Sequence, residues 1–204
     1  MLDIHTHNLQ ATSDAVISVA PSQFAPVAGK FYSVGIHPWL SAEEAARELA
    51  LLEDVASHPQ VVAIGETGLD TIKGMDFALQ EKYFAIHIGI AERLHKPLVV
   101  HMVRTSQQVV KACRGTSVPV IIHGMRGNEN VARTLINAGF YLSYGPNFNP
   151  AALRATPLDR LLAETDDTPF AIEAVIEKIA KTLSIPTPAL TQTLQHTATI
   201  LLGR

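Results

Sequence analysis

The sequence predicts an α/β protein folded as a (β/α)8 TIM barrel, and two observations predict it. First, short and continuously apolar runs alternate with helical patterns along most of the 204 residues, as in proteins built from parallel βα units. Second, polar residues able to bind metal close several of these runs, which read LDIHTH, VVAIGE, PLVVH, PVIIH and RLLAETD. Since the carboxyl ends of the strands meet at one face of such a barrel, these polar residues are expected to converge there.

Eight strands are expected, because eight runs are rich enough in apolar residues to be buried on both faces of a sheet. They lie near residues 2–7, 15–19, 31–37, 61–66, 97–103, 118–123, 139–145 and 160–166. In the first run Asp3, His5 and His7 occupy alternate positions. Their side chains are therefore expected on one face, the inside of the barrel.

Helical patterns separate most of the later strands. They lie near residues 42–57, 77–95, 105–114 and 128–138. Ser41 and Asp76 precede the first two helices as expected N-caps, because their side-chain oxygens can accept a hydrogen bond from a free amide of the first turn.

Two further helices are expected after the last strand, packed outside the barrel. The first starts at Thr168-Pro169, with Asp167 as a cap, and the second starts at Thr187-Pro188, where proline suits the first helical position. Their apolar faces consist of Ile172, Val175, Ile176, Ile179 and Leu183 in the first helix and Leu190, Leu194 and Leu201 in the second.

Composition indicates one folded domain over residues 1–204. Hydrophobic residues make up 47% and charged residues 17%, which suits a sheet covered on both faces and excludes a disordered chain. The net charge of −3 without a basic run excludes the broad basic stripe of proteins that bind duplex nucleic acid. A single cysteine, Cys113, and the lack of a signal peptide or membrane span favour a cytoplasmic protein without membrane contact. No obligate protein partner is evident.

Six residues at the predicted strand ends form a candidate metal centre. These residues are His5, His7, Glu66, His101, His123 and Asp166. A carboxylate buried at the end of a strand needs a cation or a hydrogen-bonding partner, and the segment GETGLD around Glu66 offers no basic side chain. Nitrogen and oxygen ligands without thiolate are compatible with Zn, Mn or Mg. Glu164, one layer deeper, either orients an imidazole or is an ordinary buried carboxyl group.

The order of motifs carries a resemblance to a known family. The motifs are D-x-H-x-H at 3–7, GIHPW at 35–39, GETGLD at 65–70, Gln80 with Phe84, PLVVH at 97–101, IIHG at 121–124, GFYLSYG at 139–145 and ETD at 164–166. Together they make the chain resemble the TatD family of metal-dependent deoxyribonucleases, within the amidohydrolase-like barrels.

The resemblance implies two divalent metal ions and hydrolysis of a phosphodiester by a metal-activated water. It implies that His5 and His7 hold the first ion and that His101 and His123 hold the second. Glu66 would bridge the ions, and Asp166 would bind metal and act as the base, so these two acids are the expected catalytic residues. His37 would contact the substrate, a phosphoester or a nucleic-acid end.

The chain also departs from the family pattern. Val103 stands where the family has arginine, Arg104 stands where it has an acid, and Leu9 where it often has aspartate. Gly124, Met125, Arg126 and Gly127 replace the common C-F-S-G, and the family's Pro- and Arg-rich segment after ETD is absent. Arg104 and Arg126 either replace the missing phosphate-binding arginine, since guanidinium groups grip phosphate oxygens well, or are ordinary exposed residues.

Several alternatives remain open. Trp39, Tyr144 and Phe148 either stack on a base or cap the core, and Cys113 is expected to be a packed thiol. The remaining histidines are expected to be ordinary helix or surface residues: His58, His87, His95 and His196. As alternatives to a phosphodiesterase, the barrel could cleave an amide, lactone or carboxylic ester, or could bind metal without catalysis.

Overall fold

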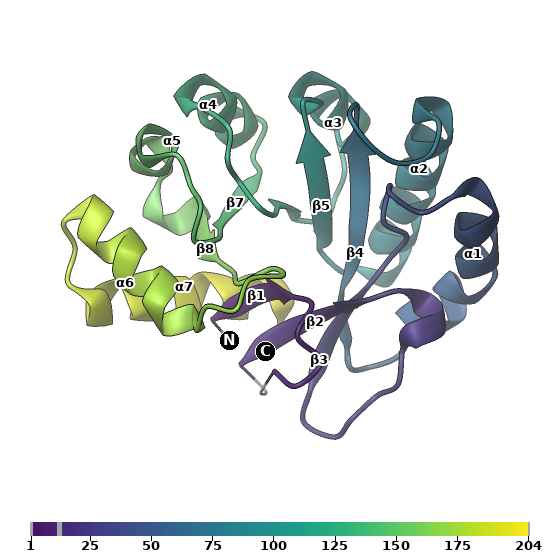
Figure 1. The fold of residues 1–204 in the computed structure, drawn as a ribbon, viewed down its shortest axis with the longest axis horizontal. Coiled ribbons are helices and arrows are strands. Elements are labelled where there is room, and N and C mark those ends of the chain that lie inside the picture. The colour runs from purple at the N-terminus through teal and green to yellow at the C-terminus, as the bar shows by residue number, and fades with distance from the viewer. Residues whose placement is uncertain (1, 12–13, 204) are drawn as a thin grey trace.

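The protein folds as a closed barrel of eight parallel strands, as predicted. In the computed structural model, which describes residues 2–11 and 14–203, the strands pair in chain order and the last pairs with the first (Figure 1). The strands are β1 (Asp3–Thr6), β2 (Ala15–Val19), β3 (Phe31–Val34), β4 (Val61–Asp70), β5 (Leu98–Val103), β6 (Val120–Ile122), β7 (Tyr141–Tyr144) and β8 (Leu161–Ala163).

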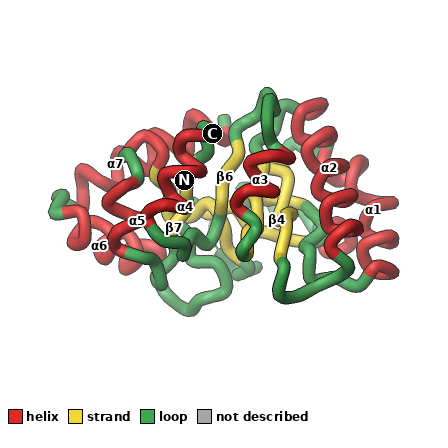
Figure 2. The backbone as a smooth tube through the Cα atoms, turned by 90° about the horizontal axis from the view of Figure 1, so that it is seen from above, coloured by secondary structure: helices red, strands yellow, loops and turns green. Residues whose placement is uncertain are grey.

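The helices lie outside the strands (Figure 2). They are α1 (Ala42–Ala56), α2 (Phe77–Leu94), α3 (Ser106–Ala112), α4 (Glu129–Asn137), α5 (Pro150–Ala155), α6 (Ile172–Leu183) and α7 (Thr187–Leu202), with the 3-10 turns η1 (Pro21–Gln23) and η2 (Leu158–Arg160). Among the described residues, no α-helix follows β1 or β2. The outer ring of helices is therefore incomplete on that side. None of the described helices is long and apolar enough to span a membrane.

The two expected N-caps are confirmed. The Ser41 hydroxyl accepts a hydrogen bond from the Glu44 amide, and the Glu44 carboxylate accepts one from the Ser41 amide at 2.8 Å. Asp76 accepts a hydrogen bond from the amide of Ala78 at 2.9 Å. Each bond satisfies an amide that would otherwise lack a partner in the first helical turn.

The region after β8 differs from the prediction. The helix expected from Pro169 starts only at Ile172, and its cap is Ala171 without a side-chain hydrogen bond, so Asp167 is not the cap. The reason is a tight turn: the amide and the hydroxyl of Thr168 both donate to the carbonyl of Thr165, at 3.1 and 2.6 Å. Thr168, which the sequence predicts at the start of the helix, therefore belongs to this turn.

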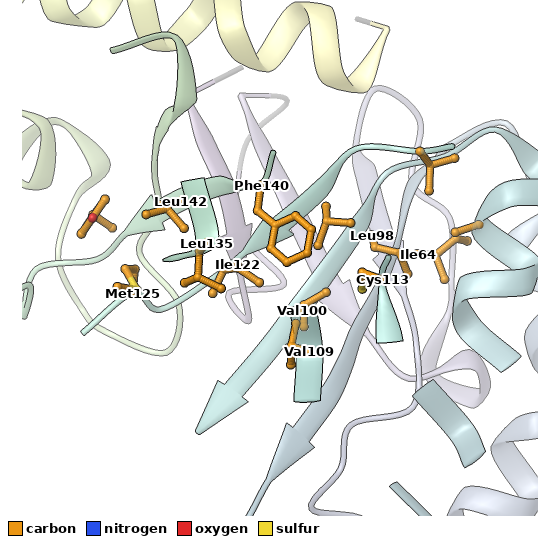
Figure 3. Packing of buried hydrophobic residues seen from close by; sticks show 14 of the residues in the cluster. Ile64, Leu98, Val100, Val109, Cys113, Ile122, Met125, Leu135, Phe140 and Leu142 are labelled. Atoms are coloured by element: carbon orange, nitrogen blue, oxygen red, sulfur yellow. The ribbon is translucent and has the colours of Figure 1, made fainter. Parts of the chain in front are cut away.

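Two apolar clusters hold the barrel together. The outer cluster packs between strands and helices and includes Cys113, which is buried as expected (Figure 3); burial raises the pKa of this thiol to about 12. The inner cluster includes Ile4, Val16, Val62, Ala63, Val99, Ile121 and Leu162 from the strands and Ala198, Leu201 and Leu202 from α7. Helix α7 thus packs against residues of the barrel interior and not only outside it.

Candidate metal centre

Glu66 lies at the centre of a cluster of imidazoles. Its side chain is only 4% exposed. The Oε1 atom lies 2.8 Å from Nε2 of His37, 3.0 Å from Nδ1 of His101 and 2.7 Å from Nε2 of His123. The Oε2 atom lies 3.3 Å from Nε2 of both His5 and His7. The two oxygens of one carboxylate therefore face two separate sets of ring nitrogens, as a bridging ligand would.

Two glycines of β4 allow Glu66 to reach this position. Gly65 and Gly68 have φ angles of +142° and +139°, which side chains rarely tolerate. A Cβ atom at Gly68 would collide with the carbonyl oxygen of His101, and one at Gly65 with that of Val99. The pairing of β4 with β5 is also irregular on either side of Glu66. The close approach of these two strands brings Glu66 and His101 together.

Asp166 is fastened to β1 beside the first two histidines. Its amide donates to the carbonyl of His5 and its carbonyl accepts from the amide of His7, both at 3.0 Å. Its φ of +56° is a left-handed conformation that aspartate adopts more readily than most residues. The Oδ1 atom then lies 3.8 Å from Nε2 of His5 and 3.7 Å from Nε2 of His7.

The cluster fits a metal-binding role. Three groups of possible ligands have donor atoms within 4.8 Å of one another: His5, His123 and Asp166; His5, His7 and Glu66; and His37, Glu66 and His101. Both ring nitrogens of His5 and His123 and the Oε2 atom of Glu66 are buried and, despite the short contacts between charged groups, make no hydrogen bond of regular geometry in the described residues. Such atoms are costly to bury unsatisfied, and a cation would satisfy them.

Opposite charges shift the pKa values within the cluster. Burial opposes ionisation of Glu66, but His123, His101 and His37 hold the pKa of this carboxyl well below its usual range. Burial likewise opposes the charged form of His123, while Glu66 and Glu164 raise the pKa of its ring well above the usual value. The hydrogen bond to Glu66 raises the pKa of His7. Without metal, His123 supplies positive charge that stabilises the ionised form of Glu66.

Two further acidic residues contact imidazole rings of the cluster. Glu164 is fully buried; its Oε1 accepts a hydrogen bond from the Gly124 amide at 2.6 Å and lies 3.5 Å from Nδ1 of His123. Asp70, which sequence analysis missed, has Oδ2 3.2 Å from Nε2 of His101. A signal for Asp70 was available, since it ends the motif GETGLD, but the strand was predicted to stop at residue 66 and instead continues to Asp70.

The expected substrate-binding residues lie in two places. His37 is part of the ligand cluster, because its Nε2 contacts Glu66. Arg104 and Arg126 are exposed and line a pocket of about 810 Å³ together with His101, His123 and Asp166. Neither guanidinium has an ion pair or hydrogen-bond partner in the described part of the chain.

Asp3 does not join the cluster, although it alternates with His5 and His7. Its carboxylate accepts hydrogen bonds from the amide and hydroxyl of Thr165 at 3.0 and 2.6 Å. The pairing of β1 with β2 is irregular between Asp3 and Thr6, so simple alternation does not hold along this strand. Burial raises the pKa of Asp3 to about 7.

The three aromatic residues considered for base stacking fall into two groups, one at the pocket and one in the core. Trp39 is 45% exposed and lines the pocket, so it is available to a ligand. Tyr144 is fully buried, bonds to the hydroxyl of Thr156 at 2.7 Å and packs against the ring of Phe148. Tyr144 and Phe148 therefore belong to the core.

His87 is a fully buried helix residue rather than a surface one. Its Nε2 accepts a hydrogen bond from the amide of Ile36 at 2.9 Å, and its Nδ1 lies 2.7 Å from the carbonyl of Tyr83. It thereby supports the segment before His37. The other histidines that were expected to be ordinary, His58, His95 and His196, belong to none of the possible ligand groups in the described residues.

Comparisons with known proteins identify the family of the chain. A family model described as TatD related DNase matches residues 5–202. An uncharacterized metal-dependent hydrolase of Mycobacterium tuberculosis, TatD, is 33% identical over 151 residues, covering 67% of this chain and 57% of that protein. An uncharacterized metal-dependent hydrolase of Buchnera aphidicola is 31% identical over 159 residues, covering 67% of this chain and 58% of its own. The aligned part thus spans less than three fifths of the length of these relatives.

Among solved structures, a TatD homologue from Escherichia coli, YJJV, superposes with a TM-score of 0.86. The superposition covers 100% of this chain and 98% of that one, at 19% identity. At this identity the likeness supports the fold.

Proposed function

Because the chain belongs to the TatD-related DNase family, we propose that it is a metal-dependent hydrolase that cleaves phosphoester bonds, with a nucleic-acid end or a small phosphodiester as substrate. The observation that carries the proposal is the position of Glu66, whose two oxygens face two sets of imidazoles. A pair of divalent ions is the ligand that such an arrangement suits.

The ligands divide naturally between the two ions. His5 and His7 lie beside Oε2 of Glu66, and Asp166 lies beside both of these rings, so these residues would hold the first ion. His101 and His123 lie beside Oε1 and would hold the second. His37 lies close enough to Oε1 to serve the second ion as well. Zn, Mn or Mg, when bound, would lower the pKa of a water molecule and neutralise charge on the phosphate.

The protein's own residues would then carry the proton and hold the substrate. Asp166, partly exposed at the pocket, accepts a proton from the attacking water as the water oxygen bonds to phosphorus. The bond from phosphorus to the leaving alcohol breaks, and the leaving oxygen takes up the proton that Asp166 accepted. Arg104 and Arg126 hold the non-bridging phosphate oxygens from the pocket wall.

A metal-by-substrate screen tests the proposal. Purified protein loaded with Zn, Mn or Mg is given a nitrophenyl phosphodiester, single-stranded oligonucleotides with free ends, and amide, lactone and carboxylic ester panels. We expect phosphodiester cleavage that falls at least 100-fold in Asp166→Asn, with unchanged rates in the exposed control Asp54→Asn. Cleavage of an amide, lactone or carboxylic ester alone would replace the proposal with an amidohydrolase reaction. No turnover on any substrate would favour a barrel that binds metal without catalysis.

A further inference from the structure

Trp39 presents an aromatic ring to the pocket beside the candidate metal centre. It is 45% exposed, and it lines the same pocket of about 810 Å³ as His101 and His123. Its ring centroid lies 5.4 Å from that of His101. It is also the only tryptophan of the chain. The proposed metal centre gives this indole no role, so its place at the pocket needs an explanation of its own.

The indole is held in place although it is exposed. Its Nε1 donates a hydrogen bond to Oδ2 of Asp70 at 2.7 Å, and Asp70 is itself only 3% exposed. The other carboxylate oxygen, Oδ1, accepts hydrogen bonds from the amides of Ile72 and Lys73 at 2.7 and 3.2 Å. Because the carboxylate is fixed from both sides, the ring has lost rotational freedom before any ligand arrives. A ligand that contacts the ring therefore does not have to order it.

The loop after β4 supports this arrangement. The amide of Met75 donates to the carbonyl of Pro38, the residue before Trp39, at 3.1 Å. The buried side chain of Gln80 accepts a hydrogen bond from the amide of Asp70 at 2.7 Å and donates one to the carbonyl of Met75 at 2.8 Å. The loop after β3 and the loop after β4 therefore hold the indole jointly.

Neither neighbouring imidazole lies flat on the indole. The rings of His37 and His101 meet it at interplanar angles of 72° and 77°. The Nζ atom of Lys73 lies over the indole, 3.7 Å from the ring centroid, but Lys73 is exposed and does not line the pocket. The indole can therefore accept a planar group that enters from the pocket.

Val103 offers a second apolar surface in the same pocket. It is the partner of Asp70 in the pairing of β4 with β5, and its carbonyl accepts a hydrogen bond from the amide of Thr71 at 3.3 Å. Since Asp70 also binds the indole, Trp39 and Val103 both adjoin this one residue, and both line the pocket. Arg104 follows directly in the chain and lines the pocket as well, so a cationic side chain lies next to the apolar surface.

We propose that Trp39 and Val103 form a binding subsite for the nucleobase at the end of a nucleic-acid substrate, next to the phosphate held by Arg104 and Arg126. The proposal rests on the proposed function for its substrate. It narrows that substrate from phosphoesters in general to those that carry a planar base beside the scissile phosphate. Bases stack on aromatic side chains with little regard to sequence, because every base has a flat aromatic face. The subsite therefore recognises a nucleotide without reading a sequence.

Two small ligands that share a phosphate test the subsite. Deoxyadenosine monophosphate carries an adenine base that deoxyribose phosphate lacks, so the ratio of their dissociation constants isolates the contribution of the base. With zinc-loaded protein we expect the nucleotide to bind at least about tenfold more tightly. The nucleotide should also quench the emission of Trp39, whereas the sugar phosphate should leave that emission unchanged.

Trp39→Leu is the informative variant, because leucine keeps an apolar side chain but has no aromatic face. Calorimetric titration should then show a preference for the nucleotide of no more than about twofold. Trp39→Phe keeps an aromatic face without the N–H donor to Asp70, and its preference should fall between these two values. Leu51→Ala is the matched control, since Leu51 is 44% exposed on α1 and does not line the pocket; it should keep the full preference.

The possible outcomes separate the subsite from the reaction. Equal affinities of the unaltered protein for the two ligands would overturn the proposal, whether or not the variants fold. A full preference that persists in folded Trp39→Leu would overturn it too. A base preference that depends on Trp39, in a protein that cleaves no phosphodiester in the metal-by-substrate screen, would support the subsite and reject only the proposed function. Phosphodiester cleavage without any base preference would reject only the subsite.

Discussion

Glu66 is the central residue of the candidate metal centre. A lone carboxylate that is almost fully buried would normally be neutral or paired with a single base, yet this one meets five imidazole nitrogens from five different histidines. Burial opposes the charge on this carboxylate, and the contacts with the rings offset that cost. Divalent ions bound within the cluster would place positive charge next to the negative charge of the carboxylates.

The Glu66→Gln variant should lose both metal ions, because the bridging charge is removed while the volume is preserved. His101→Ala should lose only one of them. Metal content of dialysed protein and calorimetric titration measure this difference. Equal loss from both variants would contradict a bridging role, as would full occupancy in Glu66→Gln.

Arg104 and Arg126 should matter for anionic substrates only. Replacing either with alanine should raise KM for a phosphodiester about tenfold, because each removes a charged hydrogen-bond donor that has no other partner. The turnover of a neutral ester, if cleaved, should stay unchanged. Steady-state kinetics on both substrates provides the comparison, and equal KM values in all variants would show that the two guanidinium groups do not hold phosphate.

His87 should make the fold sensitive to acid. Burial lowers the pKa of its ring to about 4 in the folded protein, against about 6.5 when unfolded. Below pH 6.5 the unfolded state therefore binds more protons, so the stability contributed above that pH is lost as pH falls toward 4, by about 3 kcal/mol in total. Urea unfolding between pH 7 and pH 4 should show this loss, and His87→Gln should reduce the slope; an identical slope would refute it.

For single residues, the sequence predicts which side chains gather at the rim of the barrel better than it predicts the contacts that each of them makes. The strand-end residues His5, His7, Glu66, His101 and His123 do gather in one cluster, because parallel strands deliver their carboxyl ends to one rim. The pattern of residues along the sequence does not contain the distances between side chains on different strands of the barrel. For that reason the contact of His37 with Glu66 could not be predicted, whereas Asp70 was missed because the strand was expected to end at residue 66.

Among the elements, β4 shapes the centre most strongly. Its ten residues are all buried, and its two glycines of positive φ let it lie against β5 at the level of His101. The sequence predicts that this strand ends at residue 66, because Glu66 is the polar residue that closes the apolar run. The strand persists because it pairs with β5 as far as Val103.

Gly68→Ala should therefore damage both stability and the centre. Its Cβ atom would collide with the backbone of His101, and we expect a loss of about 2 to 4 kcal/mol in the free energy of unfolding. Gly89→Ala is the matched control, since it lies within α2 with nothing near the added atom and should be stabilising by up to about 1 kcal/mol. Chemical denaturation measures both, and similar effects from the two would contradict the steric argument.

Short elements were the hardest to predict. Helix α5 has only six residues, too few for a clear apolar period, although Asn149 and Pro150 form a typical helix start. Asn149 accepts hydrogen bonds from the amides of Ala151 and Ala152 at 2.9 and 3.3 Å. Capping chemistry, rather than periodicity, was the available signal.

For the whole molecule, the fold class was predictable because every level of the sequence agrees on it. Apolar runs, caps and the alternation of strands with helices all favour the same barrel. The placement of α7 could not be predicted, because a helix with an apolar face can pack on either side of a strand layer. Its residues Ala198, Leu201 and Leu202 join the inner cluster.

Metal should stabilise the whole barrel, because the donors come from strand ends around its circumference. With free zinc at about 100 times its dissociation constant, the free energy of unfolding should rise by about 2.7 kcal/mol, which is roughly 5 to 10 °C in Tm for a chain of this size. Calorimetry with zinc and with a chelator tests this, with Glu66→Gln as the control expected to show little shift. An equal Tm in both solutions would contradict a metal centre at this site.

The backbone bridge between Asp166 and β1 links residues 160 positions apart in sequence. Closure of the barrel and assembly of the donors proposed for the first ion are consequently one event, because Asp166 reaches His5 and His7 only when the end of the eighth strand has docked on the first. During synthesis, a chain emerging from the ribosome would display His5 and His7 early but would lack the carboxylate of Asp166 until most of its length had appeared. The complete set of donors proposed for the first ion is therefore available only in the closed barrel.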